Sequence, residues 1–195
     1  TKVFLKPFSG TLKMIRGGRI NKISKLYEKC FQMKYILDIF LSVILVAILI
    51  LPMIFIGLIV KLSSKGPALY WSDRVGRDCV IFKMPKFRTM VLDTPQVATH
   101  LMNEPDSFHT PVGKFLRKYS LDELPQIFCI FNGSMALVGP RPALFNQKDL
   151  IDLREKKGVN ILKPGITGLA QVNGRDEMTI PVKVRYDEEY LMKSS

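Results

Sequence analysis

The stretch IFLSVILVAILILPMIFIGLIV, residues 39–60, decides the architecture that the sequence predicts. Its 22 residues include no charged side chain. At a rise of 1.5 Å per residue they form about 33 Å of helix, which is enough to cross a bilayer core of about 30 Å. The run is too long and too far from the first residue for a simple signal peptide. We therefore predict a helix that lies in a membrane.

Pro52 interrupts this run, because it has no N–H to donate to the helix. It leaves 13 residues before it and eight after it, and neither part is long enough to cross a bilayer alone. Basic residues flank the run on both sides, Lys34 before it and Lys61 and Lys65 after it, so the positive-inside rule favours neither orientation. Two topologies stay open: a span kinked at Pro52, and a re-entrant helix that enters and leaves the same leaflet.

Charge is distributed unevenly along the 195 residues, whose net charge is +12. Residues 1–34 contain nine Lys or Arg and one acidic residue, so this N-terminal arm carries +8. A basic arm beside an apolar helix is typical of contact with anionic membrane lipid. The rest of the chain has 20 basic and 16 acidic residues, and this near balance argues against a nucleic-acid-binding domain.

The cysteines and histidines show no spacing typical of a metal site. Cys30, Cys79 and Cys129 are far apart and form no C-x-x-C pair, and His100 and His109 show no spacing typical of metal ligands. This pattern argues against a zinc centre and against a disulfide scaffold, and it indicates a reducing compartment.

After Ser64 the sequence predicts a small domain of mixed helix and strand. We expect strands in 66–76, 79–90 and 135–145, and helices in 112–120, 146–158 and 180–192, with Gly158 ending the second of these helices. Residues 91–110 are polar and are expected to be irregular, and the glycine-rich stretch 162–175 is interpreted as a loop. The predicted fold class is α+β, with a membrane helix followed by a small α/β domain.

Two adjacent acids, Asp122 and Glu123, stand in the sequence RKYSLDELPQIF, residues 117–128. They can be explained structurally: Ser120 and Glu123 match the S-x-x-E capping box, or Asp122 is itself the N-cap, which leaves Pro125 where no N–H is needed. In both cases a helix begins here. They can also be explained chemically, because a carboxylate among basic residues is expected to stay ionised, to act as a nucleophile and to bind Mg²⁺.

Basic residues recur beside Pro or Gly, which fix the backbone that carries them. Guanidinium groups held in this way match the oxygens of phosphate. The sequence therefore predicts a phosphate-binding site formed by Lys86, Arg88, Arg117, Arg141 and Arg175.

Four motifs in a fixed order give the chain a family resemblance. They are KFRTM (86–90), SLDELPQ (120–126), VGPRP (138–142) and PGITGLAQVNGR (164–175). In these motifs, behind an apolar segment with a proline, the sequence resembles the bacterial sugar transferase family, the small monotopic phosphoglycosyl transferases. The resemblance extends from about Lys34 to Tyr190.

The resemblance implies a reaction in which a UDP-sugar gives its sugar phosphate to undecaprenyl phosphate and UMP leaves. Asp122 would attack the β-phosphorus and form a covalent phosphosugar, with Glu123 as its partner and Mg²⁺ as cofactor. Lys86, Arg117, Arg141 and Arg175 match basic positions of the family, and Asp187 matches an acidic position in its last helix.

The resemblance also implies a division of the chain into a basic arm (1–33), a re-entrant helix broken at Pro52 (34–62) and a catalytic domain on the cytoplasmic face of the bacterial inner membrane (63–195). The chain departs from the family pattern in having Leu51 before Pro52, where Ser is frequent, and Leu169 in place of a Trp. Relatives usually continue beyond the last helix, and the sequence leaves open whether a C-terminal segment beyond Ser195 is missing.

A non-enzymatic membrane adaptor with one span is the alternative function. It explains the apolar run and the charge but assigns no role to the acidic pair or to the ordered basic turns. The sequence names neither the sugar nor the glycan pathway, and it leaves open whether the chain forms a homo-oligomer.

Overall fold

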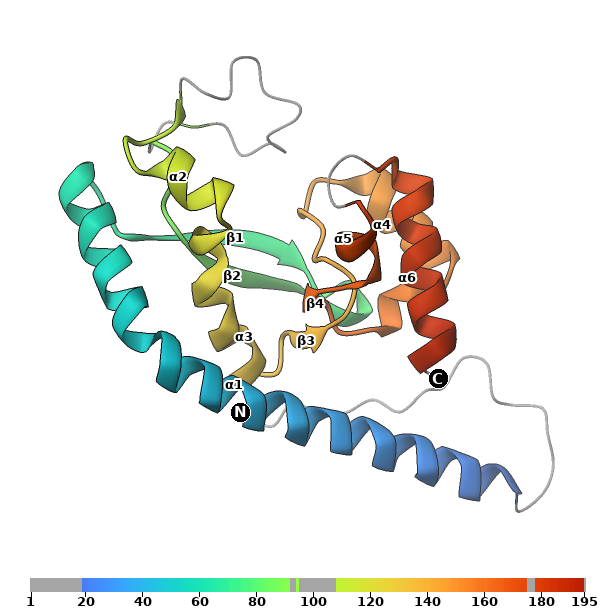
Figure 1. Ribbon diagram of the computed structural model, residues 1–195. Helices are drawn as coiled ribbons and strands as arrows, with labels where there is room; N and C mark the ends of the chain where they lie inside the picture. Colours follow the sequence, from blue (N-terminus) through green and yellow to red (C-terminus); the bar gives the residue numbers. More distant parts are fainter. Residues whose placement is uncertain (1–18, 92–93, 95–107, 175–177, 195) are drawn as a thin grey trace. The chain divides into compact units, whose positions relative to one another are not determined.

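The computed structural model describes residues 19–91, 94, 108–174 and 178–194 (Figure 1). Contacts divide the chain into two compact units, Thr1–Ile36 and Leu37–Ser195. Every described strand lies in the second unit, together with the described members of the predicted site. The predicted limits of the arm and of the membrane segment, at residues 33 and 62, stay predictions.

Helix α1 (Arg19–Ser63) contains the apolar run and continues through Pro52. The part from Gln32 to Ser63 is long and apolar enough to cross a membrane. Much of its apolar surface faces outward: Leu51 and Leu62 are 74% and 85% exposed. Figure 1 shows α1 curving along its cyan C-terminal part, where Pro52 removes one backbone hydrogen bond. The predicted long apolar helix is confirmed.

One face of α1 is nevertheless buried against the small domain. Met53, Ile56 and Val60 follow each other at helical spacing and pack with Phe87 and Leu116 in one hydrophobic cluster. The side chain of Val60 is fully buried. These apolar contacts fix the C-terminal part of α1 to the domain, so this part of the helix belongs to the domain's core.

Strands β1 (Leu69–Val75) and β2 (Ile81–Phe87) form an antiparallel hairpin. The 3-10 helix η1 (Arg77–Cys79) makes its turn, which Gly76 N–H closes by donating to Val80 O at 2.8 Å. The hairpin confirms two of the predicted strands and ends at Phe87.

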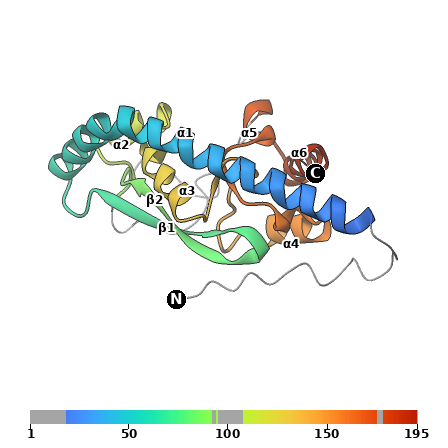
Figure 2. The ribbon, with the colours of Figure 1, turned by 90° about the horizontal axis from the view of Figure 1, so that it is seen from below.

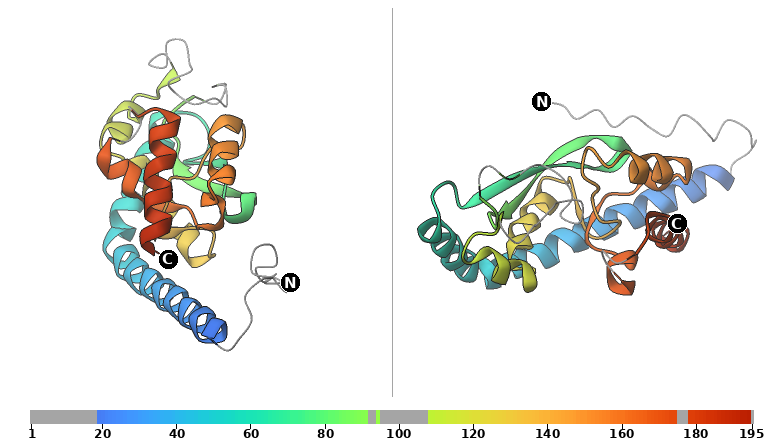
Figure 3. Two further views of the ribbon diagram at one scale, coloured as in Figure 1. Left: turned by 90° about the vertical axis from the view of Figure 1, so that its right-hand side faces the viewer. Right: turned by 90° about the horizontal axis from the view of Figure 1, so that it is seen from above.

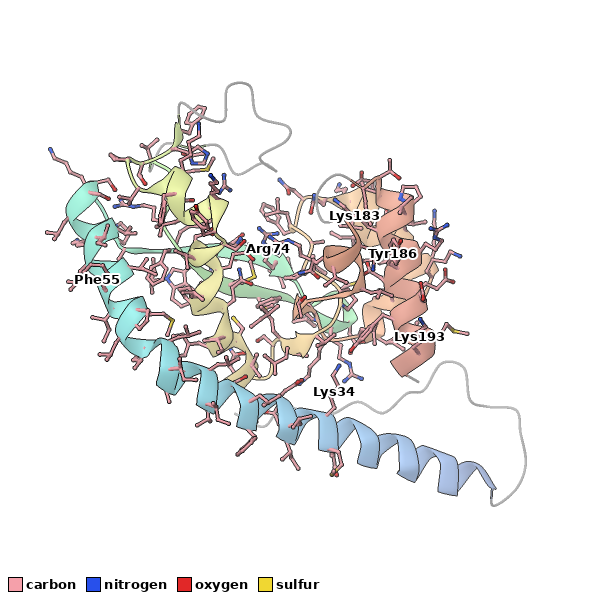
Figure 4. The ribbon with its side chains drawn as sticks, viewed as in Figure 1. Lys34, Phe55, Arg74, Lys183, Tyr186 and Lys193 are labelled. Atoms are coloured by element: carbon pink, nitrogen blue, oxygen red, sulfur yellow. The ribbon has the colours of Figure 1, made fainter. Side chains whose placement is uncertain are left out.

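Three short helices follow: α2 (Gly113–Lys118), the 3-10 helix η4 (Leu121–Ile127) and α3 (Phe128–Phe131). Figures 2 and 3 show α3 between α1 and the hairpin, and a second apolar cluster fills this space. Its buried members are Met84, Ile127, Cys129, Ile130 and Met135.

A helix begins after Ser120 as predicted, but neither predicted cap forms. Ser120 occupies the N-cap position with a left-handed backbone (φ 56°) and makes no side-chain capping bond. Asp122 lies inside the first turn of η4, and the carboxylate of Glu123 bonds to distant cations instead of reaching back. The capping interpretation was wrong because tertiary ion pairs of Glu123 take the place of the local bond.

The last part of the domain joins a small parallel sheet to three α-helices and one 3-10 helix. Strands β3 (Ala136–Val138) and β4 (Gly165–Thr167) pair in parallel. Between them lie α4 (Lys148–Lys156) and the 3-10 helix η5 (Val159–Ile161), and after them come α5 (Leu169–Asn173) and α6 (Ile180–Ser194). Gly158 follows α4 with φ 70°, as the sequence predicts for a residue that ends a helix.

The glycine-rich stretch 162–175 is more regular than the loop that we predicted, because it includes β4 and α5. Its glycines allow two backbones to touch. A Cβ atom at Gly165 would overlap the backbone of Gly139, and so would one at Gly168. With two sheets and several helices, the α+β class holds for the described residues.

Candidate active site

Glu123 is the centre of a cluster of three charged side chains. Its Oε1 atom accepts hydrogen bonds from Lys86 Nζ at 2.7 Å and from Arg141 Nη2 at 2.6 Å, and Oε2 accepts one from Arg141 Nη1 at 3.2 Å. Lys86 belongs to β2, Glu123 to η4 and Arg141 to the turn after β3. Two cations around one carboxylate leave an excess positive charge, which suits a phosphate ligand.

The ion pairs dominate the titration of Glu123. Burial alone would raise its pKa, but the charge of Lys86 and the hydrogen bonds and charge of Arg141 outweigh burial and hold the pKa far below its ordinary value. Burial lowers the pKa of Lys86, and the charge of Glu123 opposes that shift. Glu123 is therefore the ionised partner that keeps two cations in place at neutral pH.

Asp122 has a different environment although it is the next residue. It is 5% exposed, and within the described part of the chain no other side chain forms a hydrogen bond or ion pair with it. Burial raises its pKa, and the charges of Lys86 and Arg117 only partly oppose this shift. The expected effect of surrounding cations is thus outweighed by burial. Neighbouring acids with opposite pKa shifts are a frequent arrangement for catalytic pairs.

The turn that carries Arg141 is held by close backbone packing. Gly139 N–H donates to Thr167 O at 2.8 Å, and Gly165 N–H donates to Pro140 O at 2.9 Å. These two bonds join the VGPRP motif to the PGITG motif through positions where only glycine leaves room. The two motifs therefore form one support that sets the position of the Arg141 side chain.

One other predicted basic residue, Arg117, lies close to this cluster. Arg117, on α2, is near enough to Asp122 for its charge to act on the pKa of that carboxyl group. Arg175 lies outside the described residues. The structure thus brings together Lys86, Asp122, Glu123 and Arg141, with Arg117 close to Asp122.

Arg88 lies apart from these residues. Its side chain is buried, and its guanidinium group donates to Ser64 O at 2.8 Å, to Ser64 Oγ at 2.9 Å and to Lys65 O. These partners follow directly after α1, so Arg88 ties the end of α1 to the strand that carries Lys86. Its predicted part in substrate binding stays a prediction.

Asp187 also makes its direct contacts away from the acidic pair, with Arg154. It lies on α6, is 2% exposed, and accepts hydrogen bonds from Arg154 Nε at 3.0 Å and Nη2 at 2.7 Å. The sequence reading overlooked Arg154, which lies four residues after the buried Leu150 on the inner face of α4. The four-residue spacing from Leu150 could have indicated that Arg154 faces inward. The charged residues around Arg154, however, are typical of a helix end exposed to solvent.

A metal ion at this site would depend on the substrate for most of its ligands. Mg²⁺ commonly takes one or two carboxylates and completes its shell with phosphate oxygens and water. Asp122 fits as a ligand, whereas both oxygens of Glu123 already accept hydrogen bonds from cations. The described residues contain no group of three or more acidic, histidine or cysteine side chains able to hold a metal. The donor set therefore fits Mg²⁺ that binds together with a diphosphate.

A comparison with protein families matches the part of the chain that contains these residues. A family model described as bacterial sugar transferase matches residues 29–195. The matched range contains the four motifs and every residue of the cluster around Glu123, so the predicted resemblance is confirmed.

Individual relatives agree with this match. The chain is 34% identical over 200 residues to the galactosyl transferase CpsE of Streptococcus agalactiae serotype III (strain NEM316), covering 96% of this chain and 43% of the relative. It is 39% identical over 171 residues to the UDP-glucose:undecaprenyl-phosphate glucose-1-phosphate transferase of Escherichia coli (strain K12), covering 81% and 36%. It is 31% identical over 194 residues to the exopolysaccharide production protein ExoY of Sinorhizobium fredii (strain NBRC 101917 / NGR234), covering 91% and 82%. The chain spans less than half the length of the first two relatives.

Proposed function

Because the chain belongs to the bacterial sugar transferase family, we propose that it moves a sugar phosphate from a UDP-sugar to undecaprenyl phosphate and releases UMP. The names of several relatives support this reaction, since they specify sugar phosphate transfer to undecaprenyl phosphate. The observation that carries the proposal is the cluster in which Lys86 and Arg141 hold Glu123 beside the buried carboxylate of Asp122.

The proposed chemistry has two steps at one carboxylate. An oxygen of Asp122 attacks the β-phosphorus of the UDP-sugar, and the bond from that phosphorus to the bridging oxygen breaks, so UMP leaves with the electron pair. The sugar phosphate is then attached to Asp122. An oxygen of undecaprenyl phosphate attacks the same phosphorus, the bond to Asp122 breaks, and the lipid diphosphate sugar leaves.

The surrounding side chains bind and orient the phosphates in both steps. Lys86 and Arg141 are held by Glu123 and would donate hydrogen bonds to phosphate oxygens of the substrate. Arg117 adds positive charge close to Asp122. When bound through Asp122 and the substrate, Mg²⁺ would neutralise the diphosphate, and Glu123 would join its shell by exchanging one of its hydrogen bonds.

A transfer assay with purified protein tests this function. We expect UMP release and a radiolabelled organic-soluble product from one or more members of a UDP-sugar panel when undecaprenyl phosphate and Mg²⁺ are present. EDTA should stop both signals, and added Mg²⁺ should restore them. A membrane adaptor would give neither signal with any sugar. Transfer that continues undiminished in excess EDTA would remove the metal from the proposal.

We further propose that the domain lies on the cytoplasmic face of the inner membrane and that α1 enters and leaves one leaflet. The apolar outer surface of α1 supports burial in lipid, and its basic flanks support two ends on one side. The basic arm would contact anionic lipid, although residues 1–18 lie outside those the structure describes.

Cysteine labelling in cells tests this topology. Lys29→Cys and Lys65→Cys would be compared in a background in which Cys30 and Cys79 are replaced by Ala, with Lys193→Cys, 70% exposed, as the reference for the domain. All three positions should react only with a reagent that reaches the cytoplasm. If positions 29 and 65 react from opposite sides, α1 is an ordinary span.

A further inference from the structure

Five of the six backbone carbonyls of residues 138–143, at the end of β3 and in the turn that follows it, accept a hydrogen bond from another element. Four separate elements supply these donors, and each bond is between 2.8 and 3.1 Å long. The donor and acceptor pairs are Tyr190 Oη to Val138 O, Gly165 N to Pro140 O, Arg154 Nη1 to Arg141 O, Arg74 Nη1 to Pro142 O, and Val75 N to Ala143 O. An irregular turn with its carbonyls bound in this way has little freedom to move.

Arg154 is the donor that acts on the carbonyl of Arg141 itself, at 2.8 Å. Its other nitrogens, Nε and Nη2, donate to Asp187 Oδ2 at 3.0 and 2.7 Å. The pair is shielded from solvent, with 12% of the Arg154 side chain and 2% of the Asp187 side chain exposed. Figure 3 shows α4 and α6, which carry the two residues, lying side by side.

We propose that Arg154 is a positioning residue for Arg141. Held by Asp187 on one side, it fixes the Arg141 carbonyl on the other, so that the Arg141 guanidinium group meets Glu123. Asp187 then acts through Arg154 and not by touching the substrate. The effect on catalysis rests on the proposed function, whereas the effect on the turn does not.

The guanidinium group is needed because its donors are spread around a rigid plane. The Nη1 atom reaches the turn while Nε and Nη2 reach Asp187. The ammonium group of a lysine carries the same charge at a single point and cannot serve two partners on opposite sides. Arg154→Lys therefore keeps the charge opposite Asp187 and releases the Arg141 carbonyl.

The same two helices provide a matched control. Lys157, directly after the last residue of α4, pairs with Glu188 of α6 at 3.1 Å, and 47% and 36% of their side chains are exposed. This pair joins α4 to α6 as the buried pair does, but neither residue bonds to the turn that carries Arg141. Lys157→Gln therefore removes an α4–α6 ion pair without removing a support of the turn.

Backbone hydrogen exchange tests the positioning without any need for turnover. Arg154→Lys should keep a melting temperature close to that of the wild type, while peptides covering residues 136–147 exchange faster. Lys157→Gln should leave their exchange unchanged. Wild-type exchange in a folded Arg154→Lys variant would overturn the proposal, and so would equal acceleration in both variants.

Transfer kinetics test the consequence for catalysis. Arg154→Lys should lower kcat/KM on the order of 10- to 100-fold, as a small displacement of a phosphate-binding side chain does, while Lys157→Gln keeps wild-type turnover. In an Arg141→Gln background, adding Arg154→Lys should change the rate by less than about twofold, because the two residues act as a unit. If the two effects multiply, Arg154 does not act through Arg141. If wild-type protein transfers no sugar phosphate at all, the proposed function fails while the exchange data still decide the role of Arg154.

Discussion

Asp122→Asn is expected to abolish UMP release, both with undecaprenyl phosphate and without it. The amide is a poor nucleophile, so neither the first step nor the second can proceed, and the loss should be roughly 10⁴-fold or more. Wild-type protein mixed with a UDP-sugar alone should release one burst of UMP and gain the mass of a sugar phosphate. The variant should do neither.

The variant should remain folded, and this separates loss of chemistry from loss of structure. The pKa of Asp122 is raised by burial, so the folded state disfavours its charged form. A carboxyl group with a raised pKa supports the fold while protonated and loses that support as the pH rises through its folded pKa. Asn resembles the protonated form at every pH. Thermal melting at neutral pH should therefore give Asp122→Asn a midpoint equal to or above that of the wild type.

The same shift predicts the acid limb of the wild-type pH profile. The attacking group is the ionised carboxylate, so activity should fall as the pH drops through the pKa of Asp122. Because this pKa is raised, the fall should begin above the ordinary aspartate value of about 3.9.

A burst of wild-type size in Asp122→Asn would contradict the assignment. Intersecting initial-rate lines without a lipid-independent burst would favour direct attack by the lipid phosphate.

The sequence predicts the elements of this domain better than their contacts. The apolar run could be recognised from 22 uncharged residues, and the hairpin from two apolar segments around a turn. The ion pairs of Glu123 join residues 37 and 18 positions away, and no local pattern specifies which cation meets which acid. Lys86 and Arg88 show the limit clearly. They are two residues apart, but β2 ends at Phe87, so the strand alternation that would place them on one face stops.

The prediction of a loop at the glycine-rich stretch 162–175 was wrong for a related reason. Its composition disfavours regular structure, and the sequence therefore predicts a loop. In the fold, Gly165 faces Gly139 at a distance that no side chain would permit, and this close approach lies beside the parallel pair of β3 and β4. Asp187 likewise could be recognised as an acid of the last helix, but its partner Arg154 is found only when α4 packs beside α6. Both the β3–β4 pair and the Arg154–Asp187 pair depend on tertiary contacts that the local sequence does not specify.

The second large effect is expected from Glu123→Gln, which should destabilise the fold by about 3 kcal/mol at neutral pH. Glu123 is the counter-charge for Lys86 at 2.7 Å and Arg141 at 2.6 Å, and the side chains of Lys86 and Glu123 are only 14% and 18% exposed. The amide leaves Lys86 without its hydrogen-bonded counter-charge in a shielded site. As a control, Asp73→Asn removes the partner of the exposed Lys83 on the β1–β2 hairpin. It should lower the free energy of unfolding by about 0.5 kcal/mol or less.

The pH dependence of stability identifies Lys86 as the cause. In the wild type the pKa of Glu123 is lowered, so its support is present above the ordinary glutamate pKa of about 4.3 and is lost only as the pH falls below it. Burial lowers the pKa of Lys86, and without Glu123 nothing of comparable strength raises it. A lysine with a lowered folded pKa destabilises the fold below its ordinary pKa of about 10.4. The stability of Glu123→Gln should therefore rise as the pH increases from 7 to 9.

A second substitution turns this into a decisive measurement. Lys86→Met removes the unpaired ammonium and fills the same space with an apolar chain, so Glu123→Gln/Lys86→Met should recover much of the lost stability in urea unfolding at pH 7. The double variant should stay inactive, because Glu123, which fixes Arg141, and Lys86, which is proposed to bind phosphate, are both gone. If the double variant is no more stable than Glu123→Gln, the destabilisation has another source. The stability of the wild type would then not depend on the charge balance around Glu123.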